Sequence, residues 1–383
     1  MIKYCTKCLY PDTKPDIWFN KQGICSACIA YENRPKIDWK NRENEFKLLV
    51  QKHKTHNNEN YDCLIPVSGG KDSIYITIKA LEYGLKPLCV TATTCSLSKI
   101  GSRNIENLKN LGVDHISLST NPVLRRKINK FALSQIGDIS WPEHLTIFTI
   151  PVQVAIQYNI KLILWGENSQ NEYGGPSGTE NNKFLDRKWL EEFGGLLGLR
   201  VSDLTLMDEN IQQKDLLMYQ YPDKEKLESS GISGVFLGYF FPWDSISNKL
   251  ISQANGFETF KRTVEGHFLN CENLDNYQAG IHEYFMFLKY GYGRATAQAS
   301  MQIRRGRLER KLALQIVNNL EGKYPISYLG KPLNEILSEI DLSTEEFNQL
   351  CERFTNKSIF LKNNNNELIK NSSGDLVKIN YDN

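Results

Sequence analysis

The sequence Ser-Gly-Gly-Lys-Asp-Ser at residues 68–73 decides how this chain folds. It follows Tyr-Asp-Cys-Leu-Ile-Pro-Val at residues 61–67, an apolar run typical of a buried strand, and it opens a helical pattern at residues 73–83. Glycines let a loop approach an anion and take φ angles that a side chain forbids, and the free N–H groups of the next helix point at the same anion. The stretch therefore predicts a phosphate-binding loop. A tight turn that binds nothing is the alternative, because these residues also suit turns and helix caps.

The spacing excludes two common phosphate loops. The mononucleotide loop has the form G-x-x-x-x-G-K-[ST], but Ile65 stands at its first glycine and Asp72 at its hydroxyl residue. The dinucleotide pattern G-x-G-x-x-G is absent as well. SGGKDS instead resembles the PP-loop of the ATP pyrophosphatases, which split ATP between its α and β phosphates and transfer AMP to an oxygen of the substrate. That resemblance implies ATP and Mg²⁺ as cofactors.

Length and charge narrow the class of protein. The chain has 383 residues, enough for two domains or one elaborated domain. Its 46 basic and 44 acidic residues give a net charge of +2, which disfavours a protein that mainly binds nucleic acid. No apolar run reaches the roughly 18 residues of a membrane span. The first residues, Met-Ile-Lys-Tyr-Cys, lack an apolar signal region, so we expect a cytoplasmic protein without membrane or nucleic-acid partners.

Four of the nine cysteines have a metal-binding spacing. They form two C-x-x-C pairs, separated by residues 9–24, and these are Cys5, Cys8, Cys25 and Cys28. Two such pairs at this distance are typical of a four-thiolate zinc site, and four protein ligands leave no open position for catalysis. The sequence therefore predicts a structural zinc site. A redox dithiol or an iron–sulfur site is the alternative.

Strand and helix patterns alternate in the middle of the chain. The predicted strands are residues 61–67, 87–92, 115–119, 161–165 and 235–240, and the predicted helices are residues 73–83, 102–111, 122–136 and 144–158. This alternation predicts an α/β fold with a parallel, five-stranded, doubly wound sheet. We divide the chain into a zinc knuckle (1–30), a linker helix (31–60), a PP-loop ATP pyrophosphatase domain (61–268), a helical C-terminal region (269–355) and a polar tail (356–383). Residues 183–230 form an insertion that we expect to be helical and to cover the substrate cleft.

Ligands of such sheets bind beyond the carboxyl ends of the strands. Polar loops follow four of the predicted strands, at residues 68–73, 91–96, 166–176 and 241–244. Any one of them could be an ordinary solvated loop, but four at one sheet edge predict a binding site. The residues that we expect to bind ATP and its pyrophosphate are Ser68, Gly69, Gly70, Lys71, Asp72, Ser73, Thr91, Ala92 and Gly166.

The C-terminal region has two notable patterns. Residues 274–287 carry aromatic side chains at helical spacing, which indicates a core-facing helix. The basic run at residues 304–310 opens another helix. It is either a solvated face or a clamp for a substrate phosphate or carboxylate, for which the planar guanidinium is suited.

Several motifs together resemble the N-acetyl sugar amidotransferase family, the enzymes similar to PseA and WbpG. They are the paired C-x-x-C motifs, SGGKDS, GENSQNEYGG at residues 166–175, FFPWD at 240–244 and NYQAGIHEYFMFLKYGYGR at 276–294. The resemblance extends over residues 1–320. It implies an AMP- and pyrophosphate-forming ligase that turns the acetamido group of a bacterial sugar into an acetamidino group. Cys95 departs from the family pattern, where a bulkier residue without a thiol is expected, and its role and that of Cys271 stay open.

The resemblance also implies substrates and residue roles. The sugar would be a nonulosonic acid, such as pseudaminic or legionaminic acid, or a diamino uronic acid, used in flagellin glycosylation or in the O-antigen of lipopolysaccharide. Lys71 would contribute positive charge, and Asp72 would cap the helix or help hold Mg²⁺. The further candidates for magnesium or substrate contacts are Glu167, Asn168, Tyr173, Asp244, Arg294 and Arg304.

The nitrogen source can be predicted from the cysteines. A glutaminase needs a nucleophilic cysteine at its mature N-terminus or on a G-x-C-x-G elbow, and none of the nine cysteines has that context. We therefore expect ammonia from a separate glutaminase, either directly or through a channel subunit. Two other functions remain open. One is tRNA thiolation by a PP-loop enzyme, which would need a reactive cysteine, and the other is a zinc-stabilised binding protein without activity.

Overall fold

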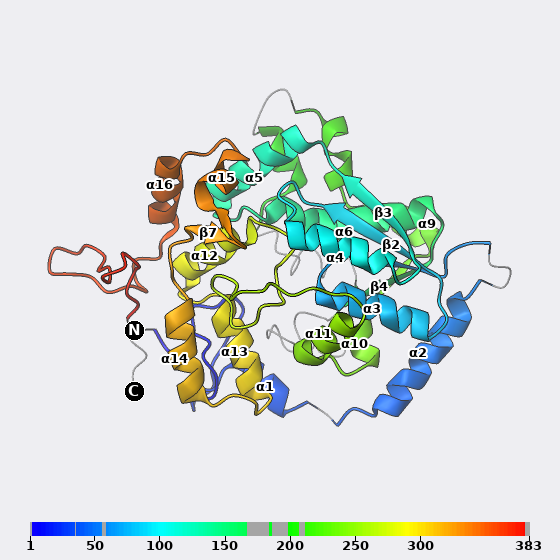
Figure 1. The fold of residues 1–383 in the computed structure, drawn as a ribbon, viewed down its shortest axis with the longest axis horizontal. Helices are drawn as coiled ribbons and strands as arrows, with labels where there is room; N and C mark the ends of the chain where they lie inside the picture. Colours follow the sequence, from blue (N-terminus) through cyan, green and yellow to red (C-terminus); the bar gives the residue numbers. More distant parts are fainter. Residues whose placement is uncertain are drawn as a thin grey trace.

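The computed structural model describes residues 2–34, 36–55, 59–166, 198–206 and 211–379, together with the backbone of residues 184–185. Figure 1 shows a central sheet flanked by helices, with a second group of helices at one side. Within these ranges no helix is both long enough and apolar enough to cross a membrane.

The sheet has five parallel strands, as the sequence predicts. They are β1 (Cys63–Pro66), β2 (Pro87–Thr93), β3 (Asp114–Ser119), β4 (Leu162–Trp165) and β6 (Ser233–Phe236), in the order β3-β2-β1-β4-β6. The two-residue strand β5 (Phe184–Leu185) adds an antiparallel edge beside β6. The chain moves outward from β1 to β3 and then returns to the other side of β1 at β4. The strand order therefore reverses between β1 and β4, which is where ligands bind in doubly wound sheets.

Helices cover both faces of this sheet. They are α3 (Lys71–Glu82), α4 (Lys99–Lys109), α5 (Pro122–Ile136) and α6 (Trp141–Gln157), close to the four predicted helices. Successive strand residues point to opposite faces, so Ile65 packs with α3 in one core cluster and Leu64 packs with α6 in another. Burial on both faces explains why these strands are continuously apolar.

The fifth predicted strand, residues 235–240, is correct only in its first two residues. The chain leaves the sheet at Phe236, and residues 237–240 form the short helix α10 (Leu237–Phe240). The aromatic residues that suggested a strand pack against α2 (Trp39–His53), the helix expected in residues 31–60. The rings of Phe240 and Phe241 lie 5.3 and 5.1 Å from the ring of Phe46, centroid to centroid. Aromatic burial against a helix thus replaces strand pairing here.

The insertion at residues 183–230 is only partly described. Its described helical segments are η1 (Val201–Leu206), η2 (Gln213–Tyr219) and α9 (Lys224–Ser230). The helix α11 (Ser245–Ala254) then packs on α3. That the insertion covers a substrate cleft stays a prediction.

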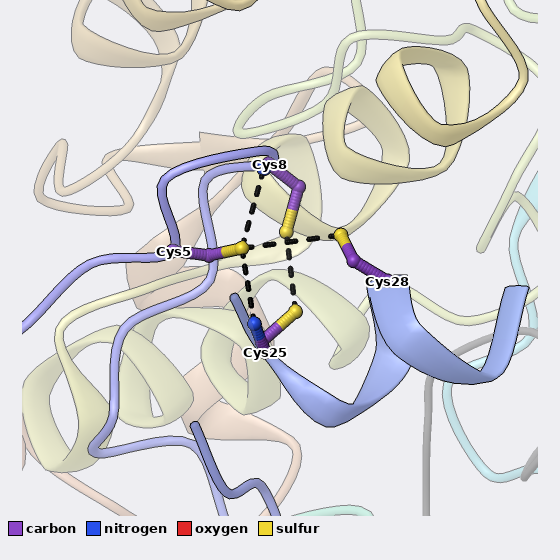
Figure 2. Close-up of side chains that lie close together, drawn as sticks. All are labelled: Cys5, Cys8, Cys25 and Cys28. Carbon is purple, nitrogen blue, oxygen red and sulfur yellow. Dashed lines mark hydrogen bonds between the residues drawn. The ribbon is translucent and has the colours of Figure 1, made fainter. Parts of the chain in front are cut away.

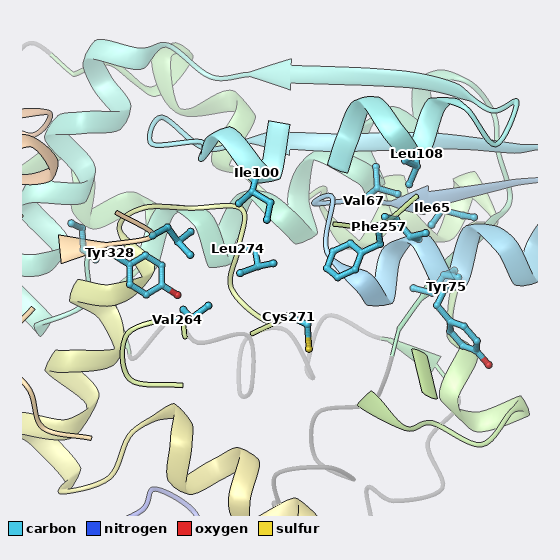
Figure 3. Close-up of a cluster of buried hydrophobic side chains, with 14 of the residues drawn as sticks. Ile65, Val67, Tyr75, Ile100, Leu108, Phe257, Val264, Cys271, Leu274 and Tyr328 are labelled. Carbon is cyan, nitrogen blue, oxygen red and sulfur yellow. The ribbon is translucent and has the colours of Figure 1, made fainter. Parts of the chain in front are cut away.

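The C-terminal region shares the main core with the sheet. Its elements are α12 (Ala279–Tyr290), α13 (Arg294–Arg304), α14 (Arg310–Leu320), β7 (Ser327–Tyr328), β8 (Lys331–Pro332), α15 (Leu333–Ser338) and α16 (Thr344–Phe354). The aromatic residues Phe285 and Phe287 of α12 are buried, as their spacing indicates. Figure 3 shows one cluster running from Ile65 and Val67 beneath the sheet, through Leu274, to Tyr328.

The N-terminal segment packs on these C-terminal helices. It includes α1 (Ser26–Glu32), which lies beside α13 in Figure 1. The backbone N–H of Leu9 donates to Ser300 Oγ at 3.2 Å, and the rings of Tyr10 and Tyr292 meet edge to face at 5.7 Å. The predicted knuckle is therefore attached to α12, α13 and α14.

Candidate active site

The loop after β1 turns sharply at Gly69. This residue has φ +81°, and a Cβ there would lie 2.9 Å from both the carbonyl oxygen of Gly101 and Cγ1 of Ile105. Only glycine fits both the backbone conformation and the space. Gly70 differs, because its φ of −78° is open to any residue and its nearest neighbour is Ser68 Oγ. The expectation that both glycines take special φ angles is thus correct for Gly69 and wrong for Gly70.

Lys71 is a buried cation held by two carboxylates. Lys71 is only 5% exposed. Its Nζ atom forms an ion pair with Asp72 and lies 3.7 Å from Glu272 Oε1. Burial opposes the charged form, but the attraction of Asp72 and Glu272 is greater and raises the pKa of Lys71 above its usual value. The ammonium group is therefore fixed and charged.

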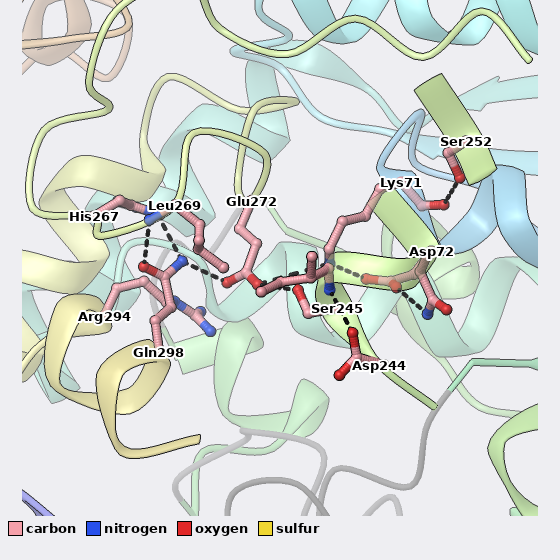
Figure 4. A network of polar contacts seen from close by, with 12 residues as sticks. Lys71, Asp72, Asp244, Ser245, Ser252, His267, Leu269, Glu272, Arg294 and Gln298 are labelled. Atoms are coloured by element: carbon pink, nitrogen blue, oxygen red, sulfur yellow. Dashed lines mark hydrogen bonds and ion pairs between the residues drawn. The ribbon is translucent and has the colours of Figure 1, made fainter. Parts of the chain in front are cut away.

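The helix α11 holds this loop in place. Ser252 Oγ donates to the carbonyl oxygen of Lys71 at 2.6 Å, and Asn248 Nδ2 donates to Asp72 Oδ1 at 2.9 Å. Figure 4 shows these contacts as one end of a polar network that begins at the phosphate loop.

Glu272 carries the network on to α13. It accepts hydrogen bonds from Ser245 Oγ at 2.8 Å and from Gln298 Nε2 at 2.7 Å. Burial alone would raise the pKa of this carboxyl, but Lys71 and Arg294 outweigh that effect and lower the pKa to about 2. Figure 4 shows Gln298 and Arg294 on the same helix, facing Glu272. A carboxylate with this many partners is a fixed negative charge.

A cavity of about 350 Å³ opens in front of this network. Four separate segments build it, and the lining residues are Ser68, Gly70, Lys71, Asp72, Ser73, Trp243, Ser245, Cys271, Glu272, Asn273, Asp275, Arg294 and Met301. Of the residues that the sequence singled out, Cys271, Arg294 and the loop residues other than Gly69 meet here.

Sequence reasoning missed the wall formed by residues 271–275. The run Asn-Cys-Glu-Asn-Leu-Asp-Asn at residues 270–276 is as rich in acid and amide side chains as the loops at the strand ends, and this was the available signal. It was passed over because no predicted strand precedes it. Burial raises the pKa of Asp275 to about 6 and that of Cys271 to about 11.

Four of the expected ATP contacts do not line the cavity, and these are Gly69, Thr91, Ala92 and Gly166. Thr91 Oγ1 donates to the carbonyl oxygen of Val67 at 2.7 Å and lies 2.8 Å from His115 Nε2, so it ties strands together. Ala92 packs against the core beneath α6. Gly166 directly follows β4. A Cβ on Gly166 would lie 3.3 Å from the indole of Trp243. Adenine contacts by these residues stay predictions.

The other predicted contacts either are not among the residues that line the cavity or lie outside the described residues. Asp244 accepts the N–H groups of residues 246 and 247 and pairs with Arg305 at 2.8 Å and with Arg307 at 2.7 Å. Burial would raise the pKa of Asp244, but these donors lower it. Arg304 lies beside the N-terminal cysteines, with its guanidinium 5.5 Å from the Tyr10 ring centroid. The candidates Glu167, Asn168 and Tyr173 lie outside the described residues.

The four predicted cysteine ligands meet at one point. Their buried sulfur atoms all lie within 4.8 Å of one another, with 3.9 Å between Cys5 and Cys28 and 3.6 Å between Cys8 and Cys25. A tetrahedral zinc ion with Zn–S bonds of about 2.3 Å has S–S edges of about 3.8 Å. Figure 2 shows the four sulfurs turned toward a common centre. The donor set therefore fits a structural zinc ion.

Surrounding groups suit this concentration of negative charge. The backbone N–H groups of Lys7, Cys8 and Cys25 donate to Cys5 Sγ at 3.3 to 3.4 Å. Arg310 of α14 donates to the carbonyl oxygens of Cys5 and Cys8. The arginines of the basic run therefore pair with Asp244 or with the cysteine turns. These contacts disfavour the interpretation of the run as a phosphate clamp.

Comparison with known proteins gives a partial family match. Residues 255–373 match the family described as "LPS biosynthesis protein WbpG-like, C-terminal domain". No curated protein sequence matches the chain.

Among solved structures, the chain is similar to an NMN synthetase from Francisella tularensis, with 14% identity, a TM-score of 0.28, and coverage of 60% of this chain and 100% of that one. It is also similar to an NH3-dependent NAD synthetase from Campylobacter jejuni in complex with the nitrate ion, with 12% identity, a TM-score of 0.29, and coverage of 57% and 97%.

Proposed function

We propose that this chain, whose residues 255–373 match the WbpG-like C-terminal domain, is an ATP-dependent ligase that converts the acetamido group of a bacterial surface sugar to an acetamidino group. The sugar would be a nonulosonic acid or a diamino uronic acid. Two features support the coarser part of this proposal, an ATP-using enzyme of ligase type. They are the family match and the phosphate loop at residues 68–73.

One observation carries the proposal. The cavity joins the phosphate loop to Glu272, Asp275 and Arg294, which all belong to the segment that matches the family. The part of the chain with an ATP-binding sequence and the part that marks the family therefore form two walls of one space. An ATP group held by the loop would face side chains of the family domain.

The chemistry requires activation of an unreactive amide. Its oxygen is a poor leaving group, and transfer of AMP to that oxygen gives an imidate ester from which AMP can leave when ammonia adds to the carbon. Positive charge and hydrogen-bond donors must stabilise the departing pyrophosphate. Lys71 supplies the charge, and the hydroxyl groups of Ser68 and Ser73 and the N–H groups that begin α3 supply donors.

Magnesium fits the same wall. Mg²⁺ is commonly bound by one or two carboxylates together with phosphate oxygens, and it would neutralise phosphate charge here. Asp72 lines the cavity with its side chain 31% exposed, so it is the carboxylate that would hold the ion.

The pKa values of two cysteine thiols disfavour tRNA thiolation. Sulfur transfer needs a thiolate, which low pKa values favour. Burial raises the pKa of Cys271 to about 11, and it raises that of Cys95, whose Sγ lies 3.7 Å from Asn129 Oδ1, to about 11 as well. Both therefore stay protonated at neutral pH. The same reasoning supports our proposal that a separate glutaminase supplies the ammonia.

The test uses the purified full chain with ATP, MgCl₂ and a panel of acetamido sugars. We expect sugar-dependent release of pyrophosphate, and with ammonium chloride a product whose mass differs by the exchange of O for NH. Glutamine in place of ammonium should give no such product. Cys271→Ser should keep its turnover, whereas a thiolating enzyme would lose it. Absence of pyrophosphate release with every sugar, or glutamine-dependent product from this chain alone, would contradict the proposal.

A further inference from the structure

Asp275 differs from the other carboxylates of the cavity. Asp72 is paired with Lys71 and Asn248, and Glu272 is paired with Lys71, Ser245 and Gln298. The Asp275 carboxylate forms no ion pair and no hydrogen bond to another side chain within the described part of the chain, and its hydrogen bond is to its own backbone N–H. Among the described acids that line the cavity, it is the one that no cation of the protein neutralises.

The position of Asp275 is fixed by its backbone. Its carbonyl oxygen accepts the N–H of Ser98, and a Cβ on Gly101 would lie 2.6 Å from its Cα, so the start of α4 packs directly on it. The main-chain bond from Tyr277 N–H to the carbonyl oxygen of Ser96 holds the following turn. The carboxylate is therefore presented to the cavity by a rigid turn.

Charged groups around Asp275 come from several elements. Glu143 of α6 repels it, and this adds to the effect of burial, which is the larger cause of its raised pKa. Lys71 and Asp72 of α3 and Arg294 of α13 line the same cavity, and the first two satisfy each other. Glu272 lies in the same loop as Asp275. The phenol of Tyr328 is also near, because the charge of Asp275 contributes to the raised pKa of Tyr328.

The other side chains of the cavity are poor proton acceptors near neutral pH. Lys71 is held protonated, Cys271 keeps its proton up to a pKa of about 11, and Glu272 binds one only near a pKa of about 2. Arg294 has no lone pair to offer, and hydroxyl groups are too weak as bases. Asp275, with a pKa of about 6, is matched to accept a proton at physiological pH.

We propose that Asp275 is the general base that removes a proton from the attacking ammonia nitrogen in the second half of the reaction. This inference rests on the proposed function and adds a catalytic residue to it. Addition of NH₃ to the imidate carbon forms the C–N bond and leaves a positive charge on the new nitrogen. Until that nitrogen loses a proton, ammonia can leave again.

Transfer of the proton to Asp275 prevents the nitrogen from leaving again as ammonia. The lone pair on nitrogen then expels AMP as the C–O bond breaks, which gives the amidinium product and AMP. The carboxylic acid returns its proton to water. The sum is amide, ATP and NH₃ converted to amidinium, AMP and pyrophosphate, with no oxidation or reduction.

Asp275→Asn separates this role from adenylation. Sugar-dependent pyrophosphate release and amidine formation are measured together in ammonium chloride, and their ratio does not depend on how much of the variant is folded. In the wild-type protein the two should occur in equal amounts. In the first turnover of Asp275→Asn we expect the burst of pyrophosphate within about threefold of the wild-type rate, with the adenylated imidate left on the enzyme, and amidine formation slower by about 100-fold, the low end of general-base contributions.

The pH profile supplies a second readout. Wild-type amidine formation should fall below a pH of about 6, following the pKa of Asp275, and this acid limb should be absent from the residual activity of Asp275→Asn. Asp275→Glu should restore part of the rate together with the limb. Asp341→Asn, at an exposed aspartate far along the chain, is the matched control and should leave both products unchanged.

Two results would overturn the inference. In one, Asp275→Asn slows the first-turnover burst of pyrophosphate as strongly as amidine formation, or raises the Mg²⁺ concentration needed for that burst, which would place Asp275 in adenylation or metal binding. In the other, the variant forms amidine at the wild-type rate. Failure of the proposed function is a different outcome, because the wild-type protein would then release no pyrophosphate with any acetamido sugar.

Discussion

The cysteine cluster and the cavity at Lys71 differ in how completely their polar groups are paired. Two short turns build the cluster, and all four ligand atoms lie within 4.8 Å of one another with no open position. Four separate segments of the chain build the cavity, and one of its walls carries the carboxylate of Asp275, which has no ion pair within the described residues. The cluster gains stability by closing, whereas the cavity keeps charged groups that are not fully paired. Stabilising sites are closed, and reactive sites keep unsatisfied groups.

The two regions are nevertheless connected through α13. The cysteine turns pack on this helix, since Leu9 donates to Ser300 and Arg304 lies over Tyr10. Arg294 and Gln298, near its other end, belong to the cavity and to the network behind it. The closed site therefore supports a wall of the open one.

Removal of zinc should have the largest effect. Structural zinc sites contribute on the order of 10 kcal/mol to folding, and residues 1–30 have little core of their own. We expect Cys8→Ser, or a strong chelator, to unfold the N-terminal segment, to release about one equivalent of zinc, and to lower the melting temperature. Zinc analysis and thermal melting measure this.

Cys95→Ser is the control, because Cys95 is a half-buried thiol outside the cluster. It should change neither the zinc content nor the melting temperature by much. A protein that binds no zinc, or that melts at the same temperature in chelator, would contradict the prediction. An iron–sulfur chromophore in the purified protein would instead favour the alternative metal site.

Loss of the Lys71 charge should have the next largest effect. Lys71→Met keeps most of the stem but leaves Glu272 as a buried carboxylate without its cation, and breaking a buried pair typically costs about 3–5 kcal/mol. Denaturant unfolding at pH 7 should show this loss, and pyrophosphate release should fall as well. Lys79→Met, on a more exposed face of the same helix, should cost under 1 kcal/mol.

The difference in unfolding free energy between the wild-type protein and Lys71→Met should depend on pH in a definite direction. The pKa of Glu272 is lowered from 4.5 to about 2, so its interactions stabilise the fold above pH 4.5 and are lost as the pH falls toward 2. The gap in stability between the wild-type protein and Lys71→Met should therefore narrow as the pH falls through this window. A constant gap would mean that the lysine stem, and not the ion pair, provides the stability.

The same contrast explains what the sequence could predict. The cysteines and the loop at residues 68–73 are local patterns, and the spacing of a few neighbouring residues correctly predicted that the four sulfurs cluster and that the loop joins a strand to a helix. The five parallel strands were also predictable, because burial on both faces makes them continuously apolar. The wall at residues 271–275 was not predictable, since it reaches Lys71 only through tertiary packing of a loop that follows no strand. For the same reason Asp244 and Arg304 looked available for substrate, although Asp244 is paired with Arg305 and Arg307 and Arg304 lies beside Tyr10.

Alanine substitutions at one glycine from each site should have the smallest effects and give the finest comparison. Gly23 (φ +71°) and Gly69 (φ +81°) both have left-handed backbones, so each substitution carries a strain of about 1 kcal/mol. The neighbours differ. A Cβ at Gly23 meets a methyl group of Thr6 at 3.0 Å, which can rotate away, whereas a Cβ at Gly69 meets the backbone oxygen of Gly101 at 2.9 Å, which cannot.

Gly112→Ala isolates the strain, because Gly112 has φ +80° and no atom within 4 Å of its Cβ position. We expect free energies of unfolding to fall by about 1 kcal/mol for Gly112→Ala, slightly more for Gly23→Ala, and about 2–3 kcal/mol for Gly69→Ala, as measured by denaturant unfolding. Only Gly69→Ala should also slow pyrophosphate release, because displacement of the Gly101 backbone moves the start of α4 and the loop together. Equal losses at all three positions would show that backbone strain alone determines the cost, and that the phosphate loop is no more tightly packed than the cysteine turns.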